Sequence, residues 1–209
     1  MFKPLHYRFL PAPNQANVPT ILLLHGTGGD ENDLVPVGQQ LAPNFNILSV
    51  RGNVLENGAP RFFRRLSMGV FDEDDLRFRA DELADFLEKT TVREGIDPQK
   101  LIALGYSNGA NIGGALLLRH PHCLAGAVLW RAMLPLQEPA PPVGSNGAPV
   151  LLLSGSSDPY FRPDVMPRYE QWLSASGFQV EHQVLTASHG LITADFQRTT
   201  AWLQRYFPL

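Results

Sequence analysis

The feature of this sequence that most restricts its fold is the alternation of short, densely apolar segments with longer segments of helical periodicity. The short segments carry apolar residues at successive positions, as strands do when helices cover both faces of their sheet. Strands that alternate with helices indicate a mostly parallel sheet joined by right-handed crossovers. We therefore predict an α/β fold whose central sheet has about seven strands and helices on both faces. The expected strands are residues 5–10, 20–24, 46–50, 101–104, 124–130, 150–153 and 179–185.

Helical patterns fill the intervals between these strands. The clearest runs from residue 74 to residue 93, where Leu76, Ala80, Leu83 and Leu87 recur every three or four positions and so share one face. Further helices are expected after residue 107 to about residue 120, at 166–176 and at 191–206. The chain has no internal repeat and no linker rich enough to divide it, and 209 residues suit one domain. We predict a single domain over residues 1–209.

The composition argues against several classes of protein. A formal net charge of −3 provides no broad basic surface for nucleic acid. The apolar stretches are strand-sized, so no membrane span is expected, and the first residues lack the apolar core of a signal peptide. The single cysteine, Cys123, cannot form an intrachain disulfide and fits a reducing compartment. We therefore expect a soluble cytoplasmic protein.

The segment LIALGYSNGANIGG, residues 101–114, contains the motif G-x-S-x-G with Ser107 at its centre. An expected strand precedes the motif and an expected helix follows it, which is the setting of a nucleophile elbow. The backbone of such an elbow is strained and passes close to its neighbours, so Gly105 and Gly109 avoid Cβ clashes. The hydroxyl then projects at the carboxyl edge of the sheet, where ligands bind. The alternative is that Ser107 is only a helix N-cap.

A serine nucleophile needs a base and an acid that orients the base. In this architecture the acid and then the histidine follow the serine, each just beyond a later strand. Asp158 follows the strand at 150–153, and His189 follows the strand at 179–185. We predict Ser107, Asp158 and His189 as a catalytic triad. The alternatives are a turn-forming Asp158, a His189 that only starts a helix, and His182, a rival base in mid-strand.

Ester hydrolysis also needs N–H donors for the oxyanion. The backbone N–H of Asn108, directly after the nucleophile, supplies one donor. The second is expected from the loop HGTGG after the strand at 20–24, and Thr27 is the candidate. The same glycines fit a plain loop that enters a helix capped by Asp30. No pair of histidines has a metal-ligand pattern, so no metal is expected.

Four segments, HGTGGDEND, GYSNGAN, SSDP and SHG, give the chain a resemblance to a known family. Over nearly its whole length the chain resembles the phospholipase/carboxylesterase family of small α/β hydrolases, which is related to acyl-protein thioesterases. The segment SVRGNVLENGAPRFFRRLSMGVFDEDDL is similar to a bacterial branch of hydroquinone-resistance hydrolases, and LWRAMLPL departs from the HHPMVP-like form of that branch. The resemblance implies the α/β-hydrolase fold and esterase chemistry at Ser107, Asp158 and His189, without a cofactor, on a small-molecule ester.

The leading prediction is a serine hydrolase that cleaves carboxylic esters or thioesters through an acyl-enzyme. Two alternatives stay open: a cofactor-free acyltransferase or perhydrolase with the same triad, and a protein of this fold that binds a ligand without turnover. The complete triad argues against a pure binding protein, because binding does not need all three groups. The sequence leaves a homodimer open.

The long connection of residues 58–72 is the expected wall of the substrate pocket, because long loops at the carboxyl edge of a sheet commonly cover active sites. We predict that Phe62 and Phe63 line an apolar pocket and that Arg64 supplies a polar edge. Met133 and Leu134, which follow another strand, are secondary candidates. The alternative is that the two phenylalanines pack into the core.

Overall fold

The computed structural model describes residues 2–13, 18–138, 144–145 and 147–208. Its central sheet has seven strands in the order β1-β3-β2-β8-β9-β10-β11. Strand β1 runs antiparallel to β3, and every other neighbouring pair in this sheet is parallel. The predicted α/β architecture is confirmed. The strands are β1 (Tyr7–Leu10), β2 (Thr20–Leu24), β3 (Asn46–Val50), β8 (Leu101–Tyr106), β9 (Gly126–Trp130), β10 (Pro149–Gly155) and β11 (Gln179–Leu185).

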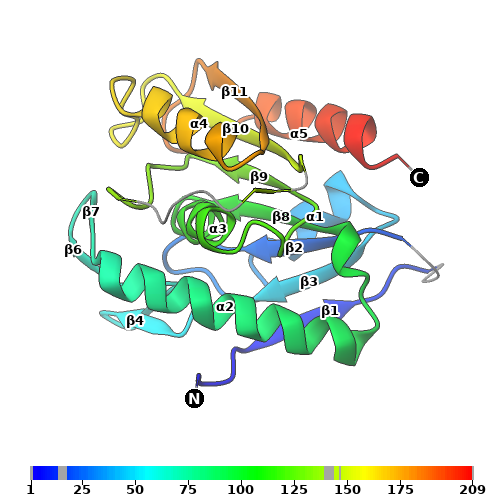
Figure 1. Cartoon of the computed structure of the whole chain (residues 1–209). Helices are drawn as coiled ribbons and strands as arrows, with labels where there is room; N and C mark the ends of the chain where they lie inside the picture. The colour runs from blue at the N-terminus through cyan, green and yellow to red at the C-terminus, as the bar shows by residue number, and fades with distance from the viewer. Residues whose placement is uncertain (1, 14–17, 139–143, 146, 209) are drawn as a thin grey trace.

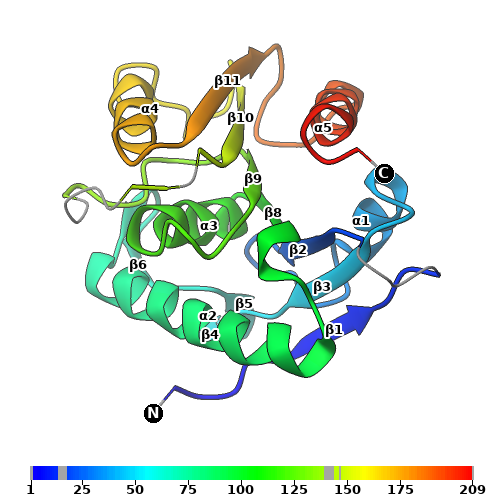
Figure 2. The ribbon, with the colours of Figure 1, turned by 45° about the vertical axis from the view of Figure 1, so that its right-hand side comes forward.

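Helices cover both faces of the sheet (Figures 1 and 2). The buried side chains accordingly form two clusters, and consecutive residues of β2 alternate between them. Ile21 and Leu23 belong to the cluster beneath α1 and α5, and Leu22 and Leu24 belong to the cluster beneath α2, α3 and α4. This alternation explains why β2 is apolar at four successive positions, from Ile21 to Leu24. The helices are α1 (Val35–Leu41), α2 (Glu73–Glu94), α3 (Asn108–Arg119), α4 (Met166–Ala175) and α5 (Thr193–Tyr206), and a short 3₁₀ helix, η1 (Pro98–Lys100), precedes β8.

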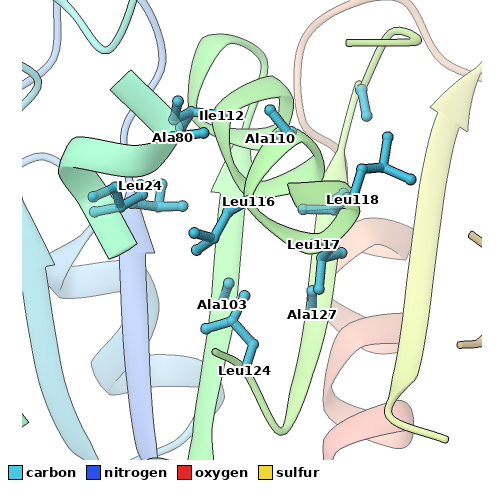
Figure 3. Close-up of a cluster of buried hydrophobic side chains, with 14 of the residues drawn as sticks. Leu24, Ala80, Ala103, Ala110, Ile112, Leu116, Leu117, Leu118, Leu124 and Ala127 are labelled. Carbon is cyan, nitrogen blue, oxygen red and sulfur yellow. The ribbon is translucent and has the colours of Figure 1, made fainter. Parts of the chain in front are cut away.

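Helix α3 lies at the centre of the larger cluster and is buried from Asn108 to Leu118. Figure 3 shows Ile112 and Leu116 of α3 in this cluster, with Leu24 of β2 and Ala80 of α2 nearby. A helix buried along almost its whole length is held by packing rather than by its own propensity. Its first residue follows Ser107 directly, so the core fixes the position of that serine.

Helix α2 matches the range predicted from its apolar spacing to within one residue at each end. The side chain of Asp72 caps it by accepting a hydrogen bond from the N–H of Asp75, and Gly95 ends it with a left-handed φ of 67°. Leu76 and Leu83 on its apolar face are fully buried. Within the described residues, neither α2 nor any other helix combines the length and the apolar character needed to cross a membrane.

Two segments differ from the sequence-based expectation. The connection of residues 58–72 belongs to a pair of small hairpins that leave the sheet after β3 and return at α2: β4 (Val54–Glu56) with β5 (Ala59–Arg61), and β6 (Arg65–Ser67) with β7 (Val70–Phe71). Asp30 does not cap a helix. Its carboxylate accepts a hydrogen bond from the N–H of Asn32 at 2.8 Å, which closes a turn, and α1 begins only at Val35.

Candidate active site

Three polar side chains from three separate strand ends meet at the carboxyl edge of the sheet. Ser107 follows β8, Asp158 follows β10 and His189 follows β11. The Nε2 atom of His189 lies 3.0 Å from Ser107 Oγ, and its Nδ1 atom lies 2.8 Å from Asp158 Oδ2. Parallel strands bring their carboxyl ends to one edge, so residues up to 82 positions apart form one hydrogen-bonded chain.

The backbone at Ser107 has the strained conformation of a nucleophile elbow, with φ of 52° and ψ of −110°. Ser107 occupies the N-cap position of α3, yet its side chain makes no capping hydrogen bond and contacts His189 instead. A Cβ at Gly105 would lie 2.5 Å from the carbonyl oxygen of Gly109, and one at Gly109 would overlap the carbonyl oxygen of Leu24. Both glycines are therefore required by close backbone approaches.

The ring of His189 is held from several sides. Asp158 is 7% exposed, and its second oxygen accepts a hydrogen bond from the N–H of Tyr160 at 2.9 Å. The rings of Tyr106 and Tyr160 contact the imidazole, with centroids 5.5 and 5.2 Å away. The Tyr106 hydroxyl also donates to the His189 carbonyl at 3.2 Å. Few orientations of the imidazole remain open to it.

Arg131, which follows β9, fixes the loop that carries His189. Its guanidinium donates to the carbonyl oxygens of Ser188 and Gly190, each at 3.0 Å, so it bonds the backbone on both sides of the histidine. It also forms a bidentate ion pair with Asp195 at 2.8 and 2.7 Å. Both side chains of this pair are completely buried. The histidine loop is thus attached to the core through a paired, desolvated charge.

The backbone amides of Thr27 and Asn108 lie at the same site, and neither donates a hydrogen bond to another residue in the described part of the chain. Asn108 opens α3, where helical N–H groups have no intrahelical acceptor. The segment from Pro60 to Phe62 braces both positions. Pro60 accepts a hydrogen bond from the N–H of Gly28 at 2.9 Å, and the N–H of Phe62 donates to Asn108 Oδ1 at 2.8 Å.

Other histidines with polar partners lie outside this chain of hydrogen bonds, among them His182 and His25. The Nε2 atom of His182 lies 2.9 Å from Ser154 Oγ, and its Nδ1 atom lies 2.7 Å from Glu170 Oε1, so it joins β11 to β10 and α4. His25 is buried, and its Nε2 accepts a hydrogen bond from the N–H of Gly52 at 3.1 Å. Burial lowers the pKa of His25 and favours its neutral form.

A cavity of about 340 Å³ opens beside Ser107 and His189. A second cavity of about 220 Å³ shares Gly69, Phe71, Met133 and Tyr160 with it and extends toward α4. The first cavity has the size of small-molecule sites, and the second adjoins it at these shared residues. The residues bordering the first cavity are Gly26, Thr27, Asp33, Arg61, Arg65, Met68, Gly69, Phe71, Tyr106, Ser107, Asn108, Asn111, Arg131, Met133, Tyr160 and His189.

The pocket residues expected from the sequence fall in different places. Met133 borders both cavities, and Leu134 borders the second one. Phe62 and Phe63 border neither: they are 4% and 0% exposed and belong to the large core cluster. Arg64 points to solvent and pairs with Asp72 at 3.0 Å. Phe62, Phe63 and Arg64 form the link between β5 and β6, and the cavity wall is built instead by other residues of the two hairpins, among them Arg61, Arg65 and Phe71.

The sequence model that defines the phospholipase/carboxylesterase family matches residues 5–206 of this chain. The chain belongs to this family. It is an esterase-type hydrolase, as the resemblance of its motifs implies.

Several relatives of this phospholipase/carboxylesterase agree with the assignment. The protein MhqD of Bacillus subtilis (strain 168), which is named as a hydrolase, is 40% identical over 182 residues, or 87% of this chain and 90% of that protein. The crystal structure of the Bacillus cereus carboxylesterase is 36% identical with a TM-score of 0.92, and the match covers 97% of this chain and 95% of that one. The structure of YahD with malic acid is 28% identical with a TM-score of 0.88, covering 97% and 100%.

Several residues at the site of this esterase were not identified from its sequence. Arg131 stands directly after a predicted strand, so the rule that selects Asp158 and His189 also selects it. Arg61 and Arg65 belong to the same RFFRR segment as Arg64, and no periodicity in that segment shows which arginine faces the cavity.

Proposed function

We propose that this esterase cleaves carboxylic esters by a Ser-His-Asp mechanism through an acyl-enzyme on Ser107. The observation that carries the proposal is the hydrogen-bonded chain from Ser107 through His189 to Asp158, which begins at a strained elbow and borders a cavity. A serine hydroxyl with no base beside it is a weak nucleophile, and an adjacent base that removes its proton makes it a strong one. The substrate class is a small-molecule ester that fits the cavity beside Ser107.

In the first half of the reaction, Ser107 Oγ attacks the ester carbonyl carbon while His189 Nε2 takes the hydroxyl proton. Asp158 holds the Nδ1–H tautomer and stabilises the imidazolium that forms. The carbonyl oxygen becomes an oxyanion and accepts hydrogen bonds from the N–H groups of Thr27 and Asn108. The tetrahedral intermediate then expels the alcohol, which takes its proton from His189.

In the second half, a water molecule enters the place of the alcohol. His189 removes a proton from it as it attacks the acyl carbon, and a second tetrahedral intermediate forms. Its collapse breaks the bond between the acyl carbon and Ser107 Oγ, and the imidazolium returns the proton to the serine. The products are a carboxylic acid and an alcohol. A thioester follows the same steps with a thiol as leaving group.

The experiment that tests this proposal uses the two serine–histidine pairs of the chain. A fluorophosphonate probe is expected to label Ser107 in the wild type, read by peptide mass spectrometry, and Ser107→Ala is expected to lose the label and on the order of 10³–10⁶-fold in kcat. Ser154, which is buried and bonded to His182, provides the matched control. Ser154→Ala keeps labelling and turnover.

The histidines give a second contrast. His189→Ala is expected to remove hydrolysis of 4-nitrophenyl acetate, whereas His182→Ala keeps it. Near-normal turnover by folded Ser107→Ala, or the reverse behaviour of the two histidine variants, would refute the mechanism. The substrate panel should include esters that carry a carboxylate, because the related YahD structure holds malic acid.

A further inference from the structure

Arg61, the last residue of β5, is a buried cation at the wall of the cavity. Its side chain is only 4% exposed, and it borders the cavity together with Ser107 and His189. A guanidinium removed from water needs compensating charge and hydrogen bonds. The guanidinium N–H groups of Arg61 that have no acceptor within the protein therefore indicate which group a ligand would have to provide.

Two of the three guanidinium nitrogens of Arg61 are used within the protein. Nε donates to the carbonyl oxygen of Phe63 at 3.2 Å, and Nη1 donates to Thr27 Oγ1 at 2.7 Å and to Glu56 Oε2 at 3.4 Å. No described residue accepts a hydrogen bond from Nη2. On a side chain that borders the cavity, Nη2 therefore carries two N–H donors that no described residue accepts.

The one carboxylate near Arg61 is already engaged by another arginine. Arg65 holds Glu56 through both oxygens, with Nε 2.9 Å from Oε1 and Nη2 2.8 Å from Oε2. One negative charge therefore serves two guanidinium groups, and the shorter contacts belong to Arg65. Burial, and then the neighbouring Arg65, lower the pKa of Arg61, which is the direction expected for a cation short of compensation.

The remaining charges at the cavity do not supply the missing anion. Arg131 is matched by its own buried partner, Asp195. Asp33 also borders the cavity, but it is exposed, and the ionisable groups that act on Arg61 are Arg65, Glu56 and Tyr160. At the wall, the guanidinium groups of Arg61 and Arg65 thus share the one carboxylate of Glu56, and Nη2 of Arg61 keeps two donors without an acceptor among the described residues. A monoanionic carboxylate matches this arrangement.

We propose that Arg61 is the centre of a carboxylate-binding subsite, so that the preferred substrates are esters bearing a free carboxylate within reach of the scissile bond. This assignment rests on the proposed role of Ser107, because the subsite is defined by its place beside that serine. The substrate carboxylate accepts hydrogen bonds from the Nη2 group and replaces the water that otherwise solvates it. Half-esters of short dicarboxylic acids have this chemistry.

The test compares two substrates that differ in one group: monomethyl glutarate, which has a carboxylate, and methyl glutaramate, which has a neutral carboxamide in its place. Hydrolysis is followed in a pH-stat at pH 7.5, and the measured quantity is the ratio of the two kcat/KM values. We expect wild-type enzyme to favour the carboxylate by about tenfold or more, equivalent to at least about 1.4 kcal/mol. Arg61→Gln brings the ratio close to one.

Three neighbouring variants sharpen the test. Arg65→Gln frees Glu56 to pair with Arg61 and is expected to lower the ratio. Glu56→Gln removes the shared carboxylate and is expected to raise it above the wild-type value. Arg64→Gln is the matched control, because this arginine is exposed and paired with Asp72 outside the cavity, and it leaves the ratio unchanged. General damage to the hairpins lowers both kcat/KM values and cannot produce opposite shifts of their ratio.

A wild-type ratio near one, or a ratio that Arg61→Gln does not change, refutes the carboxylate subsite. The esterase mechanism is unaffected by either result as long as the enzyme hydrolyses methyl glutaramate or 4-nitrophenyl acetate. Failure of the proposed mechanism would give a different result: the Ser107→Ala protein would still hydrolyse esters. In that case calorimetric titration of the Ser107→Ala protein with glutarate still decides the subsite. Binding that weakens about tenfold in Ser107→Ala/Arg61→Gln supports it, and equal binding by the two proteins refutes it.

Discussion

Replacing Arg131 by methionine separates the two contributions of the buried arginine, to stability and to catalysis. The change removes hydrogen bonds to the carbonyl oxygens of Ser188, Gly190 and Leu153 and leaves the Asp195 carboxylate buried without its cation. Removing one partner of a buried ion pair costs about 3–5 kcal/mol of unfolding free energy. For a chain of this size that loss lowers the Tm by about 6–20 °C.

The same substitution is expected to lower kcat well below the Tm, where the protein is still folded. The loop around His189 loses its attachment on both sides, and a displacement of about 1 Å at a catalytic group costs about 10²-fold. The double variant Arg131→Met/Asp195→Leu distinguishes the two effects. It regains part of the Tm, because no unpaired carboxylate remains, but not the kcat, because the two carbonyl oxygens beside His189 still lack their donor.

The measurements are chemical denaturation for unfolding free energy and steady-state hydrolysis of 4-nitrophenyl acetate at 25 °C. Wild-type kcat in the Arg131→Met protein would show that the arginine only stabilises the fold. A loss of unfolding free energy below about 1 kcal/mol, the range of an exposed pair, would refute the account of a desolvated ion pair.

Further predictions concern the elbow, the hairpins and His25. Gly109→Ala is expected to abolish turnover and lower the Tm, because its Cβ overlaps the carbonyl oxygen of Leu24, whereas Gly113→Ala, whose Cβ meets a movable side chain at 3.1 Å, has a smaller effect on both. Phe63→Ala is expected to cost about 3–5 kcal/mol of unfolding free energy without changing the preference between long and short acyl esters, and a changed preference would place that ring at the substrate. Because burial lowers the pKa of His25, the unfolded chain takes up a proton near the ordinary value of 6.5 that the folded chain does not. Unfolding free energy is therefore expected to fall as the pH drops below 6.5. Denaturant titrations at pH 7.5 and 5.5 should show a smaller fall for His25→Gln than for the wild type. An equal fall in unfolding free energy for both proteins would contradict this prediction.

The strands of the sheet are well predicted from the sequence because each one is marked by apolar residues within its own few positions. The segments 20–24, 46–50 and 179–185 coincide with β2, β3 and β11, since runs of apolar residues between turns reflect burial on both faces. The strand-end rule likewise selects Ser107, Asp158 and His189, which the structure brings within hydrogen-bonding distance. Their catalytic roles, the cytoplasmic location and the homodimer stay predictions.

What the sequence does not predict depends on side-chain direction and on distant partners. In the RFFRR segment, the two phenylalanines lie in the core, Arg64 lies in solvent, and Arg61 and Arg65 border the cavity, and no periodicity in the sequence assigns these positions. The pairing of Arg131 with Asp195 joins positions 64 apart. The strand-end rule points to Arg131, but nothing in the sequence shows that its partner is Asp195, because a buried ion pair is recognisable only when both residues are seen together.

The position of the two hairpins bears on how enzymes of this kind diversify. Residues 51–72 supply Arg61, Arg65, Met68, Gly69 and Phe71 to the cavity wall but none of Ser107, Asp158 and His189. The segment leaves the sheet after β3 and returns at α2, and its main-chain atoms, the Pro60 carbonyl and the Phe62 N–H, form hydrogen bonds with Gly28 and with the Asn108 side chain. If the proposed mechanism holds, mutations in this segment change the cavity wall and leave the three residues at the sheet edge intact. Homologues that catalyse the same reaction on different substrates are expected to differ most within residues 51–72. Similarity in this segment is then a better guide to a shared substrate than identity over the whole chain.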